Sequence, residues 1–207
     1  MKVVGQMAIY NFPLWEKCLL SLSSKVDELY LRFDTLRGNV EILEKIKKSN
    51  NPKIKNILES NVFWNKFNWR EEMIRMLDDV KPDIVIVIDE DEEFEESIKD
   101  EIIDFYKSDK LAMMVDYAVP MPTDDKSLVS KYPGKSHMKV YKWKPGLTYV
   151  PYRSFARVTN YCDPSYYWFS KSKLLHYCYF NKEIRKMRKI EFNRRREFKD
   201  LIKSPKK

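Results

Sequence analysis

Glycine is scarce in this sequence, at four of 207 residues. Neither of the common phosphate-binding patterns, G-x-x-x-x-G-K before Ser or Thr and G-x-G-x-x-G, is present, and both need glycines for close backbone approach to phosphate. Their absence argues against P-loop nucleotide hydrolases and dinucleotide enzymes. No stretch rich in Gly, Ser or Pro divides the chain either, so we expect a single domain.

Cysteine is also scarce, and long apolar runs are absent. The three cysteines form no C-x-x-C pair, which argues against a disulfide framework or a structural zinc site and favours reduced thiols. The N-terminus carries no apolar segment typical of a signal peptide, and no run of about eighteen apolar residues occurs. We therefore expect a cytoplasmic protein without a transmembrane segment.

Charged residues are plentiful but unevenly distributed. The 39 Lys and Arg residues exceed the 31 Asp and Glu residues, which gives a formal net charge of +8. Residues 182–207 are mostly basic, whereas residues 89–104 are mostly acidic. A basic segment of this kind is typical of a solvated helix face. The alternatives are attraction to a polyanion such as nucleic acid or to an anionic lipid surface.

The hydrophobic pattern predicts an α/β fold. Residues 2–8 form a short apolar run, and a helical pattern followed by a second strand leads to Asp34. Helices are predicted over residues 39–48 and 69–80. The run IVIVI at residues 84–88 is the clearest strand, because an uninterrupted β-branched run is typical of a central parallel strand covered on both faces.

The IVIVI strand ends in the acidic sequence DEDEEF. Ligands of open α/β sheets bind beyond the carboxyl ends of such strands. Asp89 and Asp91 are alternate residues, so in an extended segment they project to the same side and suit Mg²⁺ or Mn²⁺ bridging a diphosphate. The structural alternative is that DEDEEF begins a solvated helix over residues 92–106, whose dipole favours acidic residues at its start.

These residues resemble a known family. VIVIDEDEEF is similar to the strand and aspartate motif of family 2 glycosyltransferases, and MAIYNFPLWEKCLLSL resembles the family's first strand, nucleotide-binding loop and first helix. VDELYLRFDTLRGN looks like its second strand, NWREEMIRML like the helix before the aspartate strand, and LLHYCYFNKEIRKMRK like its closing His-Tyr segment. The resemblance is strongest over residues 2–93 and 174–188.

The resemblance implies a GT-A fold, in which a mostly parallel central sheet is flanked by helices. It implies one catalytic domain over residues 1–190, with a nucleotide-sugar half at about 1–93 and an acceptor half at 94–175, and a basic helix or tail at 191–207. The implied activity is that of a hexosyltransferase-like enzyme. It would use Mn²⁺ or Mg²⁺ and a nucleotide-diphosphate sugar, with a UDP-sugar favoured.

The resemblance also implies site residues. Asn11 and Arg70 would line the nucleotide site, and Asp34 would accept a hydrogen bond from the base or ribose. Asp89 would contact the ribose or a metal-bound water, and Asp91 would bind the metal. His176 would add a metal or diphosphate contact, and Lys182 and Arg185 would close over the phosphates. The family usually has a small residue and another acid after the second-strand aspartate. Here Thr35 and Leu36 follow, so base recognition is expected to differ.

Several residues have competing interpretations. His176 is a packed aromatic neighbour or a ligand, and for His137 a structural role is favoured. An inverting transfer needs a carboxylate base, for which Asp116 is preferred and Asp163 is a further candidate. Asp124 and Asp125 are others, and each of these acids also suits a turn or a helix cap.

The acceptor is expected to bind to residues 130–169, which are rich in aromatic and basic side chains: Tyr141, Trp143, Tyr149, Tyr152 and Tyr166 with Lys142, Lys144 and Arg153. Aromatic faces stack on sugars and on nucleic-acid bases alike. The acceptor is therefore a saccharide, a lipid-linked glycan or a hydroxylated base of DNA or RNA. Alternating aromatics that pack a β-hairpin are the structural alternative.

Two other classes of function remain open. A non-catalytic nucleic-acid-binding module explains the basic tail and the aromatic segment, but not DEDEEF. A phosphotransfer or nucleotidyl-transfer enzyme also uses paired aspartates with Mg²⁺. The sequence leaves the donor sugar, the stereochemical outcome and the oligomeric state undetermined.

Overall fold

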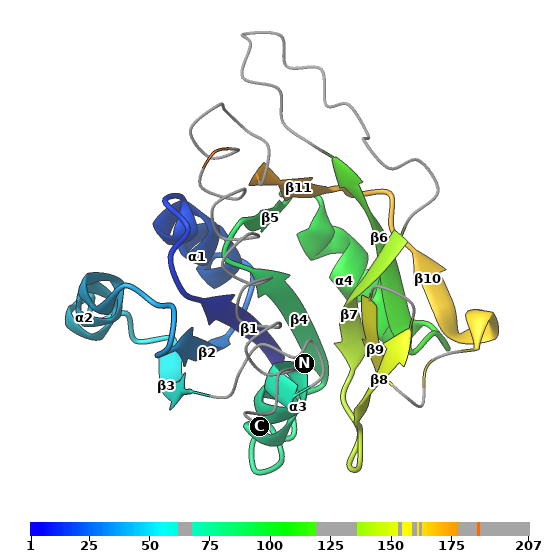
Figure 1. Ribbon diagram of the computed structural model, residues 1–207. Helices are drawn as coiled ribbons and strands as arrows, with labels where there is room; N and C mark the ends of the chain where they lie inside the picture. The colour runs from blue at the N-terminus through cyan, green and yellow to red at the C-terminus, as the bar shows by residue number, and fades with distance from the viewer. Residues whose placement is uncertain are drawn as a thin grey trace, which may run out of the picture.

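The structure, a computed structural model, describes residues 1–61, 68–118, 136–152, 155–158, 161, 163–177 and 186. The chain order is β1 (Val3–Ile9), α1 (Trp15–Ser23), β2 (Glu28–Asp34), α2 (Val40–Lys48), β3 (Ile54–Ser60), α3 (Asn68–Arg75), β4 (Ile84–Asp89), β5 (Glu92–Phe94), α4 (Ile98–Lys107), β6 (Ala112–Ala118), β7 (Ser136–Lys142), β8 (Tyr149–Tyr152), β9 (Phe155–Val158), the short helix η2 (Pro164–Tyr166), β10 (Tyr167–Phe169) and β11 (Leu174–His176) (Figure 1). The predictions for Lys182, Arg185 and residues 191–207 lie outside the described residues.

One large mixed sheet organises the molecule. Its strand order is β3-β2-β1-β4-β7-β6-β11-β5, with β10 beside β6. Strands β3, β2, β1 and β4 run parallel, and β7 is antiparallel to both β4 and β6. The carboxyl ends of β1, β2, β4 and β6 therefore lie at the same edge of the sheet. This confirms the predicted α/β class, and the sheet continues through both proposed halves of the chain.

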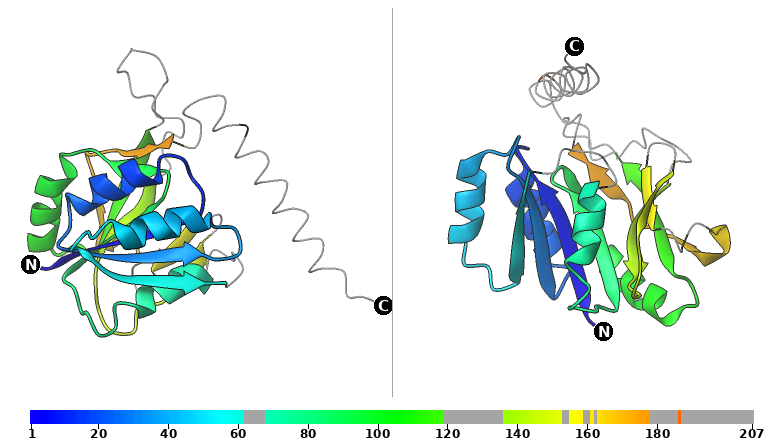
Figure 2. Two further views of the ribbon diagram at one scale, coloured as in Figure 1. Left: turned by 90° about the vertical axis from the view of Figure 1, so that its left-hand side faces the viewer. Right: turned by 60° about the horizontal axis from the view of Figure 1, so that its bottom comes forward.

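The two faces of the sheet are covered differently. Helices α1, α2 and α4 pack on one face, where Cys18, Ile42 and Phe105 join a core that includes Ile84, Ile86 and Ile88 of β4. Helix α3 and the residues around β8 pack on the other face, against Val85 and Val87. Figure 2 shows the helices on both sides of the sheet from two further directions.

Local sequence explains the main elements. The β-branched residues of β4 are buried on both faces, as the IVIVI run predicts. In α1 the buried residues recur at intervals of three and four, which is the period of a helix with one apolar stripe. Asn39 begins α2 by accepting a hydrogen bond from the Glu41 backbone N–H at 3.0 Å, which satisfies one free donor at the helix start.

Three elements differ from the sequence predictions. The suggested helix from residue 92 is wrong, because Glu92–Phe94 pairs with β11 as a strand and α4 begins only at Ile98. Helix α3 ends at Arg75 rather than at residue 80, and Lys81 adopts a positive φ of 48° directly before Pro82. The edge strand β3 was not predicted, because most of its side chains are at least partly exposed and carry no alternating apolar pattern.

No helix in the described part of the chain is long and apolar enough to cross a membrane.

Candidate active site at the carboxyl edge of the sheet

The acidic sequence after β4 forms a tight turn into β5 with mostly buried side chains. Glu90, Asp91 and Glu92 are 0%, 2% and 1% exposed, whereas the Asp89 side chain is 36% exposed. Burying a carboxylate is costly unless a cation or hydrogen-bond donors compensate for the lost water. Each of these acids therefore has partners, and the partners define the site.

Asp89 lies between two basic side chains. Its Oδ1 accepts a hydrogen bond from Arg70 Nη2 at 2.8 Å, and its Oδ2 lies 3.7 Å from Lys139 Nζ. Arg70 belongs to the first turn of α3, and its guanidinium stacks on the Trp69 ring at 3.9 Å. Arg70, predicted to line the nucleotide site, thus forms a direct ion pair with Asp89.

Lys139 reaches the turn because of an irregularity in the sheet. Met113 of β6 pairs with Val140 of β7, but the next residue, Met114, pairs with Met138, so Lys139 has no partner across the ladder. Such a bulge re-aims the side chain of the extra residue. Lys139 Nζ lies 2.6 Å from Glu92 Oε2, and both side chains are almost completely buried.

Asp91 is paired with His176, which lies 85 residues further along the chain. His176 Nε2 is 3.1 Å from Asp91 Oδ2. Strand β11 brings the histidine there, because it runs antiparallel to β5 with His176 opposite Glu92. The Tyr177 backbone N–H also donates to the Asp91 carbonyl at 2.8 Å, which fixes the two segments together. Asp91 and His176 were both predicted as metal ligands, and the fold brings them together.

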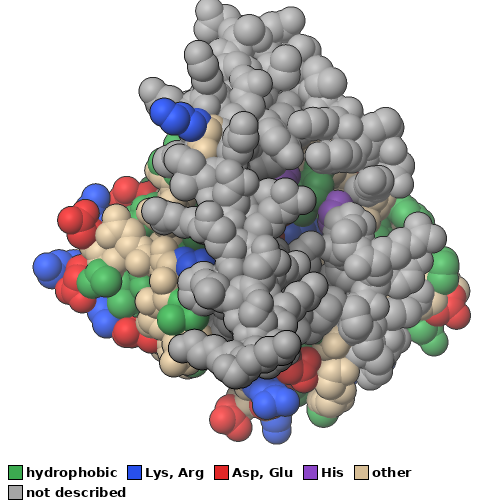
Figure 3. Space-filling model, in the orientation of Figure 1, with side chains coloured by type: hydrophobic (Ala, Val, Ile, Leu, Met, Phe, Trp, Pro, Cys, Tyr) green, Lys and Arg blue, Asp and Glu red, His purple; other side chains and the backbone are tan. Residues whose placement is uncertain are grey.

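Both histidines of the chain contact the ring of one tyrosine. The Tyr117 ring lies 4.0 Å from the His137 ring and 4.8 Å from the His176 ring, because β6 lies between β7 and β11. Figure 3 shows histidine side chains, in purple, on the face of the molecule that is turned to the viewer in Figure 1. The Tyr117 hydroxyl donates to Glu92 Oε1 at 2.6 Å, and burial, followed by the charges of Glu92 and Asp89, raises its pKa well above 10. The phenol therefore stays protonated and acts as a donor.

Glu90 positions the loop after β1. Its carboxylate accepts hydrogen bonds from the backbone N–H groups of Tyr10 at 2.8 Å and Asn11 at 3.1 Å. Asn11, predicted to face the nucleotide, is exposed next to the aspartate turn. The loop and the turn are thus connected by a completely buried side chain.

Asp34, predicted to contact the base or ribose, is 2% exposed and already engaged. One carboxylate oxygen accepts from the backbone N–H groups of Leu36 and Arg37 at 3.0 and 3.1 Å, and the other from the Arg37 guanidinium, with Nε at 2.8 Å. Gly38 closes this turn, since a Cβ there would lie 2.3 Å from the Asp34 carbonyl oxygen. In the stretch after Asp34, which differs from the pattern of family 2 glycosyltransferases, Arg37 therefore forms an internal ion pair with Asp34.

The two candidate bases lie apart from the paired aspartates. Asp116 is inside β6 rather than after it, and strand alternation directs it to the opposite face from Tyr117. The Ser136 hydroxyl at 2.6 Å, together with Lys173 at 3.3 Å, lowers the pKa of Asp116. Asp163 is exposed and begins η2, where hydrogen bonds from Ser165 lower its pKa.

Glu93 connects α1 to the residue after β11. Its carboxylate accepts from the Tyr177 hydroxyl and lies 2.9 Å from Lys17 Nζ. Burial raises the pKa of Glu93, but the hydrogen bonds from Tyr177 and Lys17 outweigh it and the net shift is downward. This cluster lies where the chain enters the segment that holds Lys182 and Arg185.

The predicted acceptor residues are only partly described. Tyr141 is 1% exposed and belongs to the core, in line with the structural interpretation, whereas Tyr166 is 39% exposed. The side chains of Tyr152 and Arg153 lie outside the described residues.

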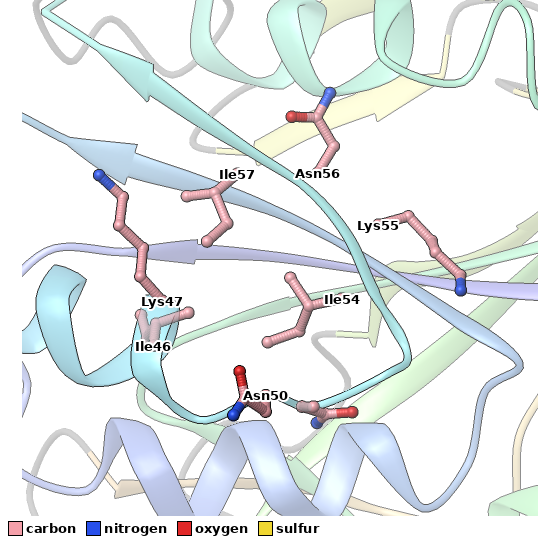
Figure 4. A pocket seen from close by; sticks show the side chains of 8 residues that line it. Ile46, Lys47, Asn50, Ile54, Lys55, Asn56 and Ile57 are labelled. Carbon is pink, nitrogen blue, oxygen red and sulfur yellow. The ribbon is translucent and has the colours of Figure 1, made fainter.

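A separate hollow of about 420 Å³ lies beside the edge strand β3 (Figure 4). It is lined by Ile46, Lys47, Asn50, Asn51, Ile54, Lys55, Asn56 and Ile57. The lining lies at the amino end of β3, at the opposite edge of the sheet from Asp89, and includes no carboxylate or histidine. We therefore assign no part of the chemistry to it.

The donor set at the turn suits a metal that takes other ligands from its substrate. Among the described residues, no group of three or more His, Cys, Asp or Glu side chains is arranged to hold a metal ion. Asp91 and His176 together offer one oxygen and one nitrogen ligand. Mg²⁺ and Mn²⁺ are commonly held by one or two protein ligands, with phosphate oxygens and water completing the shell.

Sequence reasoning missed several residues of this site. Glu90, Glu92, Tyr117 and Lys139 were not predicted. The acidic run drew attention to Asp89 and Asp91, but nothing local marks which of its other acids are buried. Lys139 gives no signal, because the bulge that directs it inward depends on the pairing of two strands.

Comparison with known proteins supports the fold. No family model and no curated protein sequence matches the chain. Among solved structures, residues 1–349 of S. aureus TarS match with a TM-score of 0.50 and 14% identity, over 69% of this chain and 47% of that one. The chain thus spans about half of the TarS structure. HddC from Yersinia pseudotuberculosis matches at a TM-score of 0.46 and 16% identity, over 90% and 97% of the two chains.

A synthase for 4-diphosphocytidyl-2C-methyl-D-erythritol from Anaerococcus prevotii matches at a TM-score of 0.46 and 14% identity, over 68% of this chain and 70% of that one. At 14% identity the likeness to TarS is one of fold, and it agrees with the mixed α/β, GT-A-like architecture of the chain.

Proposed function

We propose that this protein is a metal-dependent glycosyltransferase of the cytoplasm. It binds a nucleotide-diphosphate sugar at the carboxyl ends of β1 and β4 and transfers the sugar to a hydroxyl group. The GT-A-like fold and the resemblance to family 2 glycosyltransferases support this proposal, and the same resemblance favours a UDP-sugar. The acceptor is a saccharide, a lipid-linked glycan or a hydroxylated nucleic-acid base.

The pairing of Asp91 with His176 is the observation that carries the proposal. These side chains come from distant parts of the sequence, are mostly buried and lie 3.1 Å apart at the edge where ligands of this sheet type bind. The histidine compensates the buried Asp91 carboxylate in the protein without ligand. Imidazole and carboxylate can also both bind Mn²⁺, so the same pair can serve as metal ligands.

Charge on the departing diphosphate is the main chemical demand of glycosyl transfer. When bound at Asp91 and His176, Mn²⁺ or Mg²⁺ would neutralise that charge. Arg70 contributes a fixed positive charge beside Asp89, and Lys182 and Arg185 remain proposals for closing over the phosphates. Lys139 is committed to Glu92 and Asp89, so we assign it to holding the turn rather than the substrate.

Asp116 remains our proposal for the base that deprotonates the acceptor, with Asp163 as the second candidate. A carboxylate with a lowered pKa is ionised at neutral pH and can accept a proton, although its driving force for proton transfer is reduced. Replacing Asp116 with Asn should lower kcat and leave donor binding unchanged. An unchanged kcat would remove Asp116 from the mechanism.

Calorimetric titration tests the donor site. Purified protein is titrated with UDP-, GDP-, CMP- and TDP-sugars, with and without Mn²⁺, and Asp91→Asn is compared with Asp104→Asn, an exposed acid on α4. The proposal predicts one nucleotide class with Mn²⁺-dependent affinity that is lost in Asp91→Asn and kept in Asp104→Asn. If no nucleotide binds while nucleic acid binds in a salt-sensitive way, the protein is the basic binding module instead.

Product analysis separates sugar transfer from nucleotidyl transfer. A glycosyltransferase releases a nucleoside diphosphate from the donor, whereas a nucleotidyltransferase exchanges pyrophosphate with a nucleoside triphosphate. Release of the diphosphate with Mn²⁺ supports our proposal, and exchange of labelled pyrophosphate would replace it.

A further inference from the structure

Near Asp89, two buried hydrogen-bond donors have no partner within the described part of the chain. The indole Nε1 of Trp69 and the Nη1 of Arg70 are shielded from solvent and have no hydrogen-bond partner among the described residues. The two residues are 5% and 8% exposed. Leaving a buried donor unpaired destabilises a protein, so native structures rarely retain one without a reason.

The two donors lie close together. The Arg70 guanidinium stacks on the Trp69 ring at 3.9 Å, and its other terminal nitrogen, Nη2, donates to Asp89. Trp69 packs against Ala8, which is the residue opposite Asp89 in the pairing of β1 with β4. Indole, guanidinium and carboxylate therefore form a row over the carboxyl ends of two central strands.

We propose that Trp69 Nε1 and Arg70 Nη1 bind an acceptor oxygen of the nucleotide part of the donor. The inference rests on the proposed function and extends it to Trp69, for which the sequence predicted no role. An indole N–H can only donate, and so can a guanidinium, so the matching group is a phosphate oxygen or a base carbonyl. Because the nitrogens lie below the surface, the oxygen that meets them is buried in the complex.

The test replaces the indole without emptying its space. Trp69→Phe keeps an aromatic ring under Arg70 but removes the N–H, and Trp168→Phe, on the distant strand β10, is the matched control. Affinity is measured by calorimetry with UDP, GDP, their monophosphates and inorganic pyrophosphate. We expect the best ligand to bind Trp69→Phe about tenfold more weakly, as for loss of a hydrogen bond to a charged acceptor. The control should bind as wild type does.

The unliganded stability provides the second readout. If the indole N–H gains a hydrogen-bond partner only when the ligand binds, removing it leaves the Tm of the free protein unchanged or slightly higher. Affinity equal to that of the wild type overturns the proposal, and so does a lower Tm with unaltered affinity, which would mean a structural partner.

The ligand series identifies the acceptor. A loss that includes pyrophosphate indicates a phosphate oxygen, and a loss limited to nucleotides indicates the base or ribose. If Trp69→Phe fails to fold, the indole N–H signals of ¹⁵N-labelled wild type are used, with Trp69 assigned by elimination from Phe variants of the other four of the five tryptophans. A Trp69 shift on adding nucleotide or pyrophosphate supports the proposal even if sugar transfer is never observed. No shift with any of these ligands overturns it.

Discussion

Asp89 and Asp91 lie two residues apart but are neutralised in different ways. The Asp89 side chain is 36% exposed and is held between the side chains of Arg70 and Lys139. The Asp91 side chain is 3% exposed and is paired with His176, which can lose its proton. The first aspartate is fixed by the protein's own cations, whereas the second has a partner that can become a metal ligand beside it.

The different partners of Asp89 and Asp91 indicate different roles for the two aspartates. A metal competes poorly for a carboxylate already paired with arginine and lysine. Mn²⁺ competes better for a carboxylate beside a neutral imidazole, because both groups can bind it. We therefore expect Asp91 to control metal-dependent affinity and Asp89 to maintain the shape of the turn.

The largest expected effect concerns the buried ion pair between Lys139 and Glu92, which holds the turn after β4. Lys139→Met leaves Glu92 buried without its cation, and we expect the free energy of unfolding to fall by about 3 kcal/mol. The double variant Lys139→Met with Glu92→Gln should recover most of this loss, because no unpaired charge remains. Urea unfolding measures both variants. A single variant as stable as the wild type would show that the bulge contributes nothing to the turn.

The second largest expected effect concerns Asp91, the aspartate that is paired with His176. Asp91→Asn should lower kcat/KM by on the order of 100-fold, because transition-state charge on the diphosphate loses its metal. Its stability should change little compared with Lys139→Met. Steady-state kinetics at several Mn²⁺ concentrations measure the effect. Equal losses in Asp89→Asn and Asp91→Asn, with the same Mn²⁺ dependence, would erase the distinction between the two aspartates.

Asp34 offers a third case, in which the turn geometry is fixed by the backbone. A Cβ at residue 38 would lie 2.3 Å from the Asp34 carbonyl oxygen and 2.3 Å from the Phe33 ring. We expect Gly38→Ala to destabilise the protein by about 2 kcal/mol through overpacking. Thermal unfolding checks this value. A loss below a few tenths of a kcal/mol would mean that the turn opens easily and leaves Asp34 available to a nucleotide.

The smallest effect is a pH dependence at Glu93. Its pKa in the folded protein is below the ordinary 4.5, so its stabilisation is present above that value and is lost as pH falls through the lowered one. At pH 7 we expect Glu93→Gln to be less stable than the wild type by about 1 kcal/mol, since Lys17 is half exposed. Unfolding at pH 7 and pH 3 should show the difference shrinking. A difference independent of pH would indicate lost packing instead.

Much of the central sheet could be predicted from the sequence. The IVIVI run indicates β4 by local composition, since an uninterrupted β-branched run is typical of a strand covered on both faces. The position of Asp89 and Asp91 follows from it. The link between Asp91 and His176 came from the family resemblance, and the structure places the two side chains within contact distance.

What the sequence could not reveal depends on distant pairings. Glu92 is part of a strand because β11 lies beside it, although an acidic run after a strand also suits a helix start. Lys139 points inward because one residue is extra in the pairing of β6 with β7. Strand β3 has few buried residues, so periodicity gives no signal there. In each case the deciding partner is far away in the chain.

Pulsed electron paramagnetic resonance of bound Mn²⁺ tests whether His176 is a metal ligand. The protein is mixed with Mn²⁺ and the nucleoside diphosphate that binds best in the calorimetric series, and the spectrum is searched for coupling to an imidazole nitrogen. We expect such a coupling in wild type and in His137→Gln, and its loss in His176→Gln. Bound Mn²⁺ without any imidazole coupling, or with coupling that survives in His176→Gln, would contradict it.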